Sequence, residues 1–417
     1  MLKNKVNLKI KGDKIIWIVY LLFMLVSLVL VFSSMGKTVY ENQGGNIFGM
    51  FRKHFFILTF GFFVTYVFHL INYKYYSKYS NIMYGFSIML LAITLLIGGI
   101  FGKAASRWIV LPFIGQFQPS EIVKYLLIIY VAHRLSILKE GIKDSKNFSI
   151  LVGQIIFVSM LIFPQNLSTA FLLFGCCLIM MFIAGAKIKH MLCTIGLGIV
   201  ALFVVFLINE INPKIIGRGD TWVNRIENFI DNDKTENNQP NTAKMAIATG
   251  GILGKGIGNT EQGRFLNESH NDFIFAIILE EGGLLLGGTI IILYMILFYR
   301  SIKISRNAPG LFGSYLAIGI GLIIILQAMI NIMVATTIIP VTGQTLPFIS
   351  YGGTSLILSS FGLGLLLSID AKSNKRKTDS ENKNLDSENE NTESKDSGSG
   401  TKSDKDDIKT NRNESNN

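Results

Sequence analysis

FGSYLAIGIGLIIILQAMINIMVATTII, residues 312–339, contains no charged side chain. A helix needs roughly 20 apolar residues to cross about 30 Å of hydrocarbon, so this stretch is long enough to span a membrane. A second run of the same kind covers residues 15–35. In both runs the apolar residues are continuous rather than alternating, which excludes a membrane β-barrel. The sequence therefore predicts an all-α, polytopic membrane protein.

Charge is scarce in the chain and unevenly distributed. Only 16% of the 417 residues are charged, whereas a soluble domain carries about 25%. The net charge of +11 would favour nucleic-acid binding in a soluble protein, but the cytoplasmic loops of membrane proteins also collect Lys and Arg. The basic charge therefore indicates membrane topology, and we expect no nucleic-acid partner.

Outward from these two runs, the sequence contains ten predicted spans. They lie at residues 15–35, 54–71, 80–101, 119–135, 148–163, 168–186, 191–211, 272–299, 312–338 and 354–370. An even number of spans places both termini on the same side of the membrane.

The distribution of lysine and arginine decides which side that is. The N-terminal tail, every second connector and the C-terminal boundary are rich in both residue types. The opposite short connectors contain only Lys37, Arg52, Lys53, Lys103 and Arg107. Because positive charge is retained in the cytoplasm, the sequence predicts a plasma membrane protein with both termini cytoplasmic.

The predicted spans divide the chain into three parts. Residues 1–14 form a basic cytoplasmic tail, residues 15–370 the membrane domain, and residues 371–417 a charged cytoplasmic tail, expected to be disordered because it can bury too little apolar surface to fold alone. Between the seventh and eighth spans, residues 212–270 form a long extracytoplasmic loop, and loops of that length are usually functional or disordered. Its apolar part, residues 245–258, is expected at the membrane interface or dipping into it against protein.

Burial of ionisable residues at the rim of a bilayer is unfavourable, so each one is a candidate functional residue. Glu121 and Lys124 stand three residues apart at the outer start of the fourth span, on one helix face. They can form a structural ion pair, or they can line a polar cavity in which Lys124 binds an anionic group. Glu280 and Glu281 lie deeper in the eighth span, where polar contact between helices is the favoured interpretation.

Asp272 is the candidate general base. It opens the eighth span directly after the long loop, where a first-turn carboxylate can also simply cap the helix. His270 lies two residues earlier. The two residues could hold a metal ion, but two ligands without a third make a weak site. We therefore assign no metal ligand.

Two irregular segments lie on the outer side. GGILGKGIG, residues 250–258, lacks the Gly-Lys-Ser/Thr ending of a nucleotide-binding loop and a preceding strand. Its glycines instead allow tight turns near the membrane or near a lipid-linked ligand. PVTGQTLPFISYGG, residues 340–353, combines Pro and Gly at membrane depth. Irregular backbone there must be buried in protein or line a cavity.

Four segments together resemble the shape, elongation, division and sporulation (SEDS) family. They are RWI with QPSEIVK (107–109 and 118–124), GGILGKGIGN (250–259), HNDFIFA followed by EE (270–276 and 280–281), and PVTG with LPFISYGGTS (340–343 and 346–355). The resemblance extends over residues 15–369. Three positions depart from the family pattern: Asn166 replaces an aspartate, Asn271 a threonine and Gly282 a leucine.

The resemblance implies a peptidoglycan glycosyltransferase that polymerises lipid II on the outer face of the plasma membrane with a class B penicillin-binding protein as partner. It implies that Asp272 is the essential acid. A sugar hydroxyl needs a base within about 3 Å, and a pyrophosphate leaving group needs positive charge, for which Lys124 is the first candidate. A divalent cation, Mg²⁺ or Mn²⁺, could assist. Further candidates for the substrate site or its cavity are Glu121, Arg107, Lys255, Arg264, His270 and Ser350.

Three alternatives stay open at this point. A lipid II flippase would place its polar site near the membrane midplane, often within matching repeats, and no repeat is evident. A non-catalytic scaffold would make Asp272 dispensable. Within the family, the charged tails favour a division-type (FtsW-type) member, acting at the septum with other divisome proteins, over an elongation-type (RodA-type) member.

Overall fold

All ten predicted spans are helices in the computed structural model, which describes residues 11–34, 47–100, 109–111, 115–211, 225, 229, 239–264 and 272–396. In chain order they are α1 (Lys14–Ser34), α3 (Ile47–Leu70), α5 (Ser80–Ile100), α6 (Pro119–Leu138), α7 (Ser145–Ile162), α8 (Leu167–Ile183), α9 (Ile188–Ile211), α12 (Ile274–Asn307), α13 (Leu311–Ala335) and α14 (Gly353–Asp396). Among the described residues, seven of the predicted spans can cross a membrane by length and composition alone, and α8 and part of α9 are shorter apolar helices. α6, which carries Glu121, Lys124 and Arg134, belongs to neither group. The all-α, polytopic fold class is confirmed.

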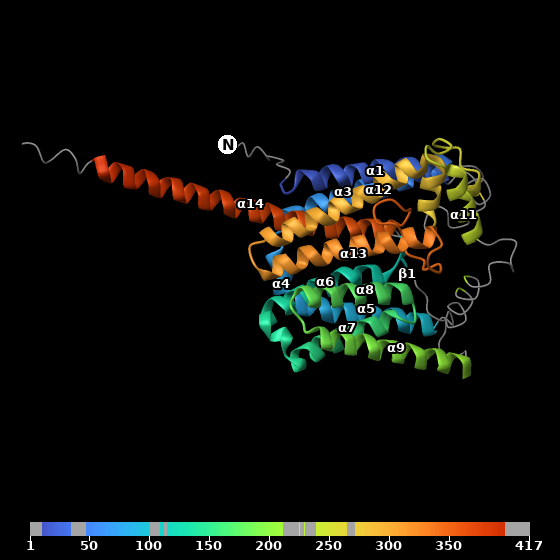
Figure 1. The fold of residues 1–417 in the computed structure, drawn as a ribbon, viewed down its shortest axis with the longest axis horizontal. Coiled ribbons are helices and arrows are strands. Elements are labelled where there is room, and N and C mark those ends of the chain that lie inside the picture. Colours follow the sequence, from blue (N-terminus) through green and yellow to red (C-terminus); the bar gives the residue numbers. More distant parts are fainter. Residues whose placement is uncertain are drawn as a thin grey trace, which may run out of the picture.

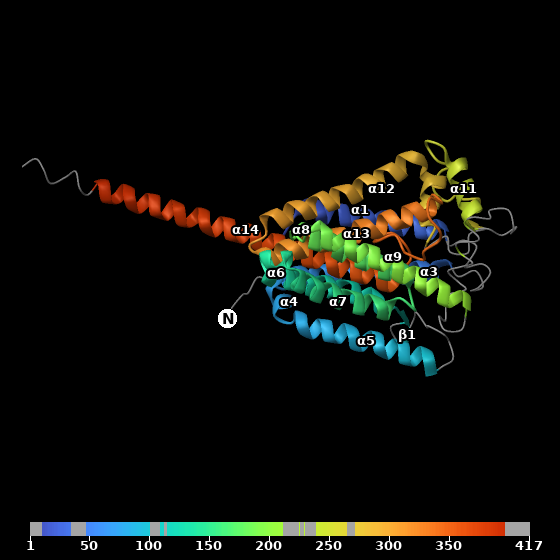
Figure 2. The same ribbon diagram turned by 60° about the horizontal axis from the view of Figure 1, so that its bottom comes forward.

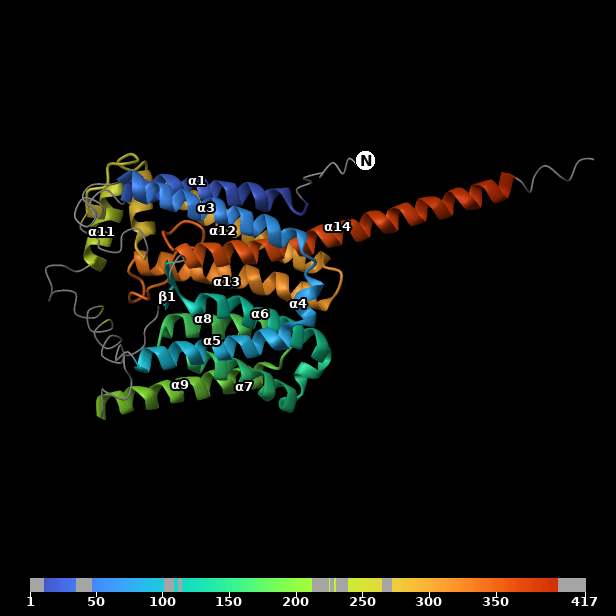
Figure 3. The ribbon, with the colours of Figure 1, turned by 180° about the vertical axis from the view of Figure 1, so that it is seen from behind.

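The long helices form an elongated bundle and run roughly along one direction (Figure 1). α1 begins and α14 leaves the bundle at the same end, which we call the terminal end (Figures 1 and 3). α11 (Gln239–Gly250) lies at the opposite end, which we call the α11 end. Figure 2 shows α5 and α12 on opposite edges of the bundle. An even number of spans requires the first and last helices to share an end in this way.

Short elements lie at both ends of the bundle. At the terminal end, α4 (Lys74–Lys78) precedes α5, and the 3-10 helix η1 (Lys139–Lys143) joins α6 to α7. At the α11 end, β1 (Ile109–Leu111) pairs antiparallel with β2 (Gly115–Phe117), with Ile109 opposite Phe117. A second 3-10 helix, η2 (Gln262–Arg264), follows α11.

α13 is the central helix of the bundle. It packs against α6, α8, α12 and α14, and 72% of its most apolar stretch is buried. At Gly319, an added Cβ would lie 2.8 Å from Ile128 of α6 and from Met180 of α8. Small residues allow membrane helices to approach this closely, so Gly319 fixes the contact of three helices.

The outer surface of the bundle is apolar, unlike that of a soluble protein. Large hydrophobic side chains face outward along α3, α5 and α9, including Phe56, Leu96 and Phe203. Extended exposed apolar surfaces indicate contact with another apolar phase. The surface therefore suits contact with lipid tails.

Two helices differ from their predicted extents. The sequence predicts one span over 272–299, whereas Gly283 (φ 63°) breaks α12 and Asp272 precedes its first residue. The sequence also predicts a disordered tail after residue 370, whereas α14 continues as a helix to Asp396. A helix that the bundle has nucleated can be extended at a lower free-energy cost than starting a new one. The composition of residues 371–396 itself does not favour helix, because Asn, Ser, Asp and Thr outnumber Lys, Arg and Glu there.

Candidate functional site

The Glu121–Lys124 ion pair predicted on α6 forms and is buried. Pro119 begins the helix, and Lys124 Nζ lies 2.9 Å from Glu121 Oε1. The Lys124 and Glu121 side chains are 1% and 8% exposed, so ions in water screen the pair weakly. Lys124 Nζ also donates to Gln327 Oε1 of α13 over 2.8 Å. The pair therefore links α6 to α13.

Gln327 extends this polar contact to the last outer connector. Its Nε2 donates to the Thr345 carbonyl oxygen over 3.0 Å, and the Thr345 hydroxyl donates to Ser355 Oγ of α14 over 2.9 Å. Buried networks of satisfied hydrogen bonds favour a single arrangement. The irregular backbone of residues 340–353 is thus tied to α13 and α14.

Asn331, one helical turn beyond Gln327, holds the backbone of the candidate base. Its Nδ2 donates to the carbonyl oxygen of Asp272 over 3.0 Å and to that of Gln344 over 2.7 Å. Gln344 Nε2 donates in turn to Thr169 Oγ1 of α8 over 2.8 Å. Asn331 is fully buried, and its Oδ1 accepts no hydrogen bond in the described part of the chain.

These buried polar residues share α13 as their common support. We call the following set the α13 network: Glu121, Lys124, Gln327, Asn331, Gln344 and Thr345. It joins α6, α13 and the connector before α14, and its contact with Asp272 lies at the start of α12.

Asp272 lies just before α12, at the α11 end. It is partly exposed, and the N-cap position of α12 belongs to Phe273, whose side chain makes no capping bond. Asp272 therefore lies one residue before the N-cap position. Free N–H groups in the first turn of a helix stabilise a nearby anion, so this position suits a carboxylate that also meets solvent.

The glycine-rich segment pairs with the break in α12. On one side of Gly283, two carbonyl groups of α12 accept hydrogen bonds from the segment, and on the other side two N–H groups donate to it. The four bonds run from Lys255 N to Glu280 O, Gly256 N to Glu281 O, Leu284 N to Gly251 O and Leu285 N to Ile252 O, at 2.9–3.2 Å. A broken helix at membrane depth needs such partners for its backbone groups.

Glycine is required at this junction because the two backbones touch. A Cβ on Gly254 would overlap the Glu281 carbonyl oxygen, and a Cβ on Gly250 would overlap that of Leu279. Gly254 also has a φ of +79°, a conformation that side chains rarely adopt. The segment predicted to form tight turns therefore completes α12 rather than binding a nucleotide.

Glu280 anchors the turn that follows the glycines. It is fully buried, and its carboxylate accepts four hydrogen bonds. The donors are Thr260 Oγ1 (2.6 Å), Glu261 N (3.0 Å), Gln262 N (3.1 Å) and Lys255 Nζ (3.4 Å). Four donors fill most of the acceptor capacity of a carboxylate, so Glu280 has a structural place.

Lys255 and Glu281 are both engaged near this anchor. Lys255 Nζ also lies 2.8 Å from Glu261 Oε2, and Glu261 and then Glu280 raise the pKa of Lys255 above its ordinary value. Glu281 accepts a hydrogen bond from Ser33 of α1, which is a polar contact between helices. The positive charge of Lys255 is thus balanced by two carboxylates.

Of the remaining predicted site residues, only Ser350 has a side chain in the part of the chain that the structure describes. Arg107 and His270 lie outside the described residues, and Arg264 ends η2 with a side chain that is also outside the description. Ser350 is 2% exposed and accepts a hydrogen bond from Leu346 N over 2.8 Å. In the described ranges, no three His, Cys, Asp or Glu side chains gather closely enough to hold a metal ion.

Sequence reasoning missed several members of the site. Gln327 and Asn331 are four residues apart in a run without charge, so they share one helix face, and that spacing could have identified them. Asn166, which replaces the family aspartate, accepts a hydrogen bond from Thr169 N over 3.2 Å and caps α8. A neutral amide therefore suffices at this position for the capping bond.

The arrangement offers two chemical capacities at the α11 end. Asp272 is a partly exposed carboxylate that can accept a proton from a hydroxyl group. Lys124 is a buried cation that can stabilise negative charge on a leaving group. Lys124 belongs to the α13 network, and the backbone of Asp272 contacts it through Asn331. A carboxylate and a cation held by one network suit a reaction in which a hydroxyl group displaces an anionic leaving group.

Comparison with known proteins gives consistent relationships. A model of the cell cycle protein family FtsW/RodA/SpoVE matches residues 13–375. The chain is 33% identical over 375 residues to stage V sporulation protein E of Bacillus subtilis (strain 168), covering 88% of this chain and 98% of that protein. It is 30% identical over 374 residues to the probable peptidoglycan glycosyltransferase FtsW of Geobacter sp. (strain M18), covering 86% and 97%. Its fold is similar to that of a chain in a peptidoglycan synthase complex, with a TM-score of 0.67, 23% identity and coverage of 87% and 98%.

Proposed function

The chain belongs to the FtsW/RodA/SpoVE (SEDS) family of cell cycle proteins, and on that premise we propose that it is a peptidoglycan glycosyltransferase that polymerises lipid II into glycan strands. The observation that carries the proposal is the place of Asp272, a partly exposed carboxylate whose backbone is held by Asn331. The names of the relatives, among them a probable peptidoglycan glycosyltransferase, support the same activity.

Asp272 acts as the general base in the proposed reaction. The 4-hydroxyl oxygen of one lipid-linked disaccharide attacks the anomeric carbon of another, while Asp272 takes the hydroxyl proton. A glycosidic C–O bond forms with inversion, the C–O bond to pyrophosphate breaks, and polyprenyl pyrophosphate leaves with the bonding electrons. Because Asp272 is partly exposed, it can return the proton to water. A positioned base typically contributes about 10²–10⁴-fold to the rate.

Lys124 is the proposed contact for the pyrophosphate. Glu121 and Gln327 use two of its three N–H donors in the described part of the chain. The third donor can reach a phosphate oxygen only if the site opens on substrate binding, because the Lys124 side chain is 1% exposed. The Glu121 carboxylate offsets the positive charge of Lys124. The main role proposed for Lys124 is therefore to orient the leaving group, rather than to draw it in by charge. Arg107 and Arg264 are further candidates, whereas the two carboxylates beside Lys255 make it a weaker one.

The proposed setting is the bacterial plasma membrane, with the α11 end outside and the terminal end in the cytoplasm. The excess of Lys and Arg in the connectors of the terminal end supports this orientation. A class B penicillin-binding protein is the proposed partner, since the fold is similar to a chain of a peptidoglycan synthase complex. Septal synthesis with divisome proteins is the proposed role, and an elongation-type role is the alternative.

In vitro polymerisation tests the proposal. The full-length protein, purified with its penicillin-binding partner, is given lipid II, and the product is separated on a gel. We expect glycan polymer from the wild type and none from Asp272→Asn. The same preparation, placed in liposomes, reports lipid II transport. Transport without polymer would refute the enzyme and favour a flippase.

A further inference from the structure

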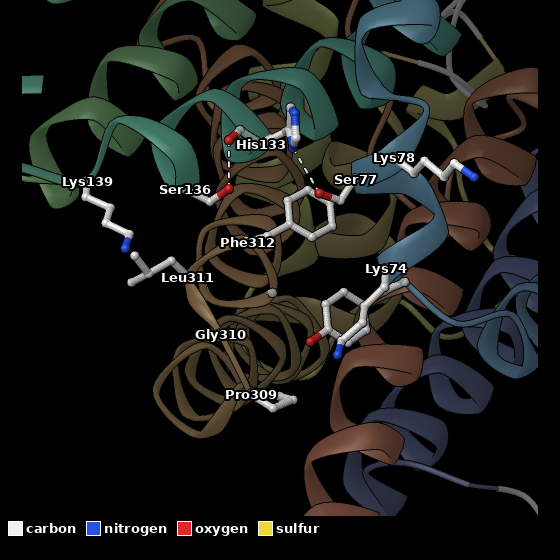
Figure 4. Close-up of a pocket in the computed structure, with 12 residues that line it drawn as sticks. Lys74, Ser77, Lys78, His133, Ser136, Lys139, Pro309, Gly310, Leu311 and Phe312 are labelled. Atoms are coloured by element: carbon white, nitrogen blue, oxygen red, sulfur yellow. Dashed lines mark hydrogen bonds between the residues drawn. The ribbon is translucent and has the colours of Figure 1, made fainter. Parts of the chain in front are cut away.

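A second polar site lies at the terminal end, far from the α13 network. An open cavity of about 670 Å³ is lined by residues of α4, the end of α6, the loop between α12 and α13, and the first turn of α13. Figure 4 shows its residues arriving from these elements. Ligand sites in proteins occupy roughly 300–1,000 Å³, so the cavity can hold a small ligand or a lipid headgroup.

The cavity is positively charged. Lys74 and Lys78 of α4 and Lys139, directly after α6, line it, and none of its lining residues is Asp or Glu. Within the described ranges these lysines form no ion pair with a carboxylate, whereas nearby Lys143 pairs with Glu140 over 3.3 Å. An anion in the cavity would therefore meet uncompensated positive charge.

Hydrogen-bonding groups line the same cavity. Ser77 Oγ lies 2.9 Å from His133 Nδ1, and Ser136 Oγ donates to the His133 carbonyl oxygen over 2.7 Å, as Figure 4 shows. When Ser77 donates to Nδ1, the neutral ring carries its proton on Nε2. The imidazole then adds a directed donor to the lysine charges.

The adjoining wall of the cavity is apolar. The rings of Tyr73 and Phe312 stack with centroids 6.0 Å apart, and Leu311 beside them is 43% exposed. A cationic side next to an exposed apolar side matches an amphiphile, and a soluble phosphate would leave the apolar side unused.

We propose that this cavity binds the phosphate headgroup of an anionic phospholipid of the inner leaflet, given the orientation proposed above. Lys74 and Lys139 neutralise the phosphate, and Leu311 contacts the first part of an acyl chain. Basic pockets between helices on the cytoplasmic side suit such headgroups. The general enrichment of Lys and Arg in cytoplasmic loops accounts for the number of lysines at this end. It does not account for lysines that have no carboxylate partner among the described residues, together with hydroxyl groups and an apolar wall, lining the same cavity.

Two double variants that remove equal charge at the terminal end test the proposal. Lys74→Ser with Lys139→Ser alters the cavity, and Lys187→Ser with Lys189→Ser removes exposed lysines at the start of α9 that do not line it. Native mass spectrometry of each full-length protein measures retained phosphatidylglycerol, with phosphatidylcholine as reference. We expect the cavity variant to lose about ten-fold in retention and the α9 variant to match the wild type.

Further arms separate the possible sources of binding. Lys74→Arg with Lys139→Arg keeps the charge and is expected to retain phosphatidylglycerol. Equal losses in the two serine double variants would overturn the proposal, because retention would then follow only the general surface charge. Displacement of the lipid by excess inorganic phosphate, with equal retention of phosphatidylcholine, would overturn the lipid assignment in favour of free phosphate.

Discussion

Asp272 stands just before α12 and Glu280 lies two turns into it, and their surroundings differ. Asp272 is partly exposed, and a hydrogen bond from Asn331 holds it through its backbone oxygen. Glu280 is fully buried, and its carboxylate accepts four hydrogen bonds. A carboxylate occupied by four donors has little capacity left for a substrate, whereas the Asp272 carboxylate is partly exposed and can be reached from solvent.

The difference separates a structural carboxylate from the proposed catalytic one within nine residues of sequence, 272–280. The Glu280 end fixes the glycine-rich turn to the break at Gly283, and the Asp272 end carries the proposed base. Substitutions around Glu280 are therefore expected to lower stability, and substitutions around Asp272 to lower activity while the protein stays folded.

The largest loss of stability is expected for Glu280→Ala. The change leaves two backbone N–H groups, the Thr260 hydroxyl and the Lys255 ammonium without their acceptor. Loss of one partner from a buried charged cluster costs about 3–5 kcal/mol of unfolding free energy, which thermal unfolding in detergent measures. Glu261→Ala is the control, because this carboxylate is 70% exposed and is expected to cost less than about 1 kcal/mol. Equal unfolding temperatures for both variants would remove Glu280 as an anchor.

Gly254→Ala should destabilise the same junction by about 3 kcal/mol, since a Cβ combines a positive φ with overlap of the Glu281 carbonyl oxygen. Gly258→Ala is the matched control. Gly258 has a φ of +89°, and no heavy atom lies within 4 Å of its added Cβ, so it should lose only about 1–2 kcal/mol. Chemical denaturation of both variants compares them, and a smaller loss for Gly254→Ala would contradict the close backbone contact.

Asn331→Ala sharpens the comparison from the other end. It removes the donor to the Asp272 and Gln344 carbonyl oxygens, so we expect kcat to fall about 10–100-fold with KM nearly unchanged. The loss of stability should stay near 1–2 kcal/mol. Thr336→Ala is the control, because its hydroxyl bonds only within α13. A change in KM alone would argue for substrate contact instead of positioning.

The smallest effect is expected for Lys255→Gln. Its side chain is 24% exposed and pairs with Glu261 and Glu280, and ion pairs that reach solvent contribute little to stability, so its unfolding temperature should change least among these variants. Because those two carboxylates already balance its charge, polymerisation should stay within a few-fold of wild type. A large fall in kcat without a loss of stability would instead indicate that Lys255 contacts the leaving group.

The helices were predictable because each appears as a long run with few charges, and Glu121 with Lys124 were predictable from their spacing. The break at Gly283 was not, because glycine is common in membrane helices and the partners of the break lie in a distant turn. Gln327 and Asn331 were missed for a related reason. The role of an amide side chain in an apolar helix depends on the hydrogen-bond partners on the facing helices. A single sequence does not show which helices face each other.

The place of Asp272 is the central claim, and lipid II polymerisation by Asp272→Asn, measured together with its thermal unfolding, tests it most directly. We predict a loss of polymer of about 10²-fold or more with an unfolding temperature equal to that of the wild type. Polymer formed at the wild-type rate would contradict the account, and so would a loss of polymer accompanied by the unfolding expected for Glu280→Ala.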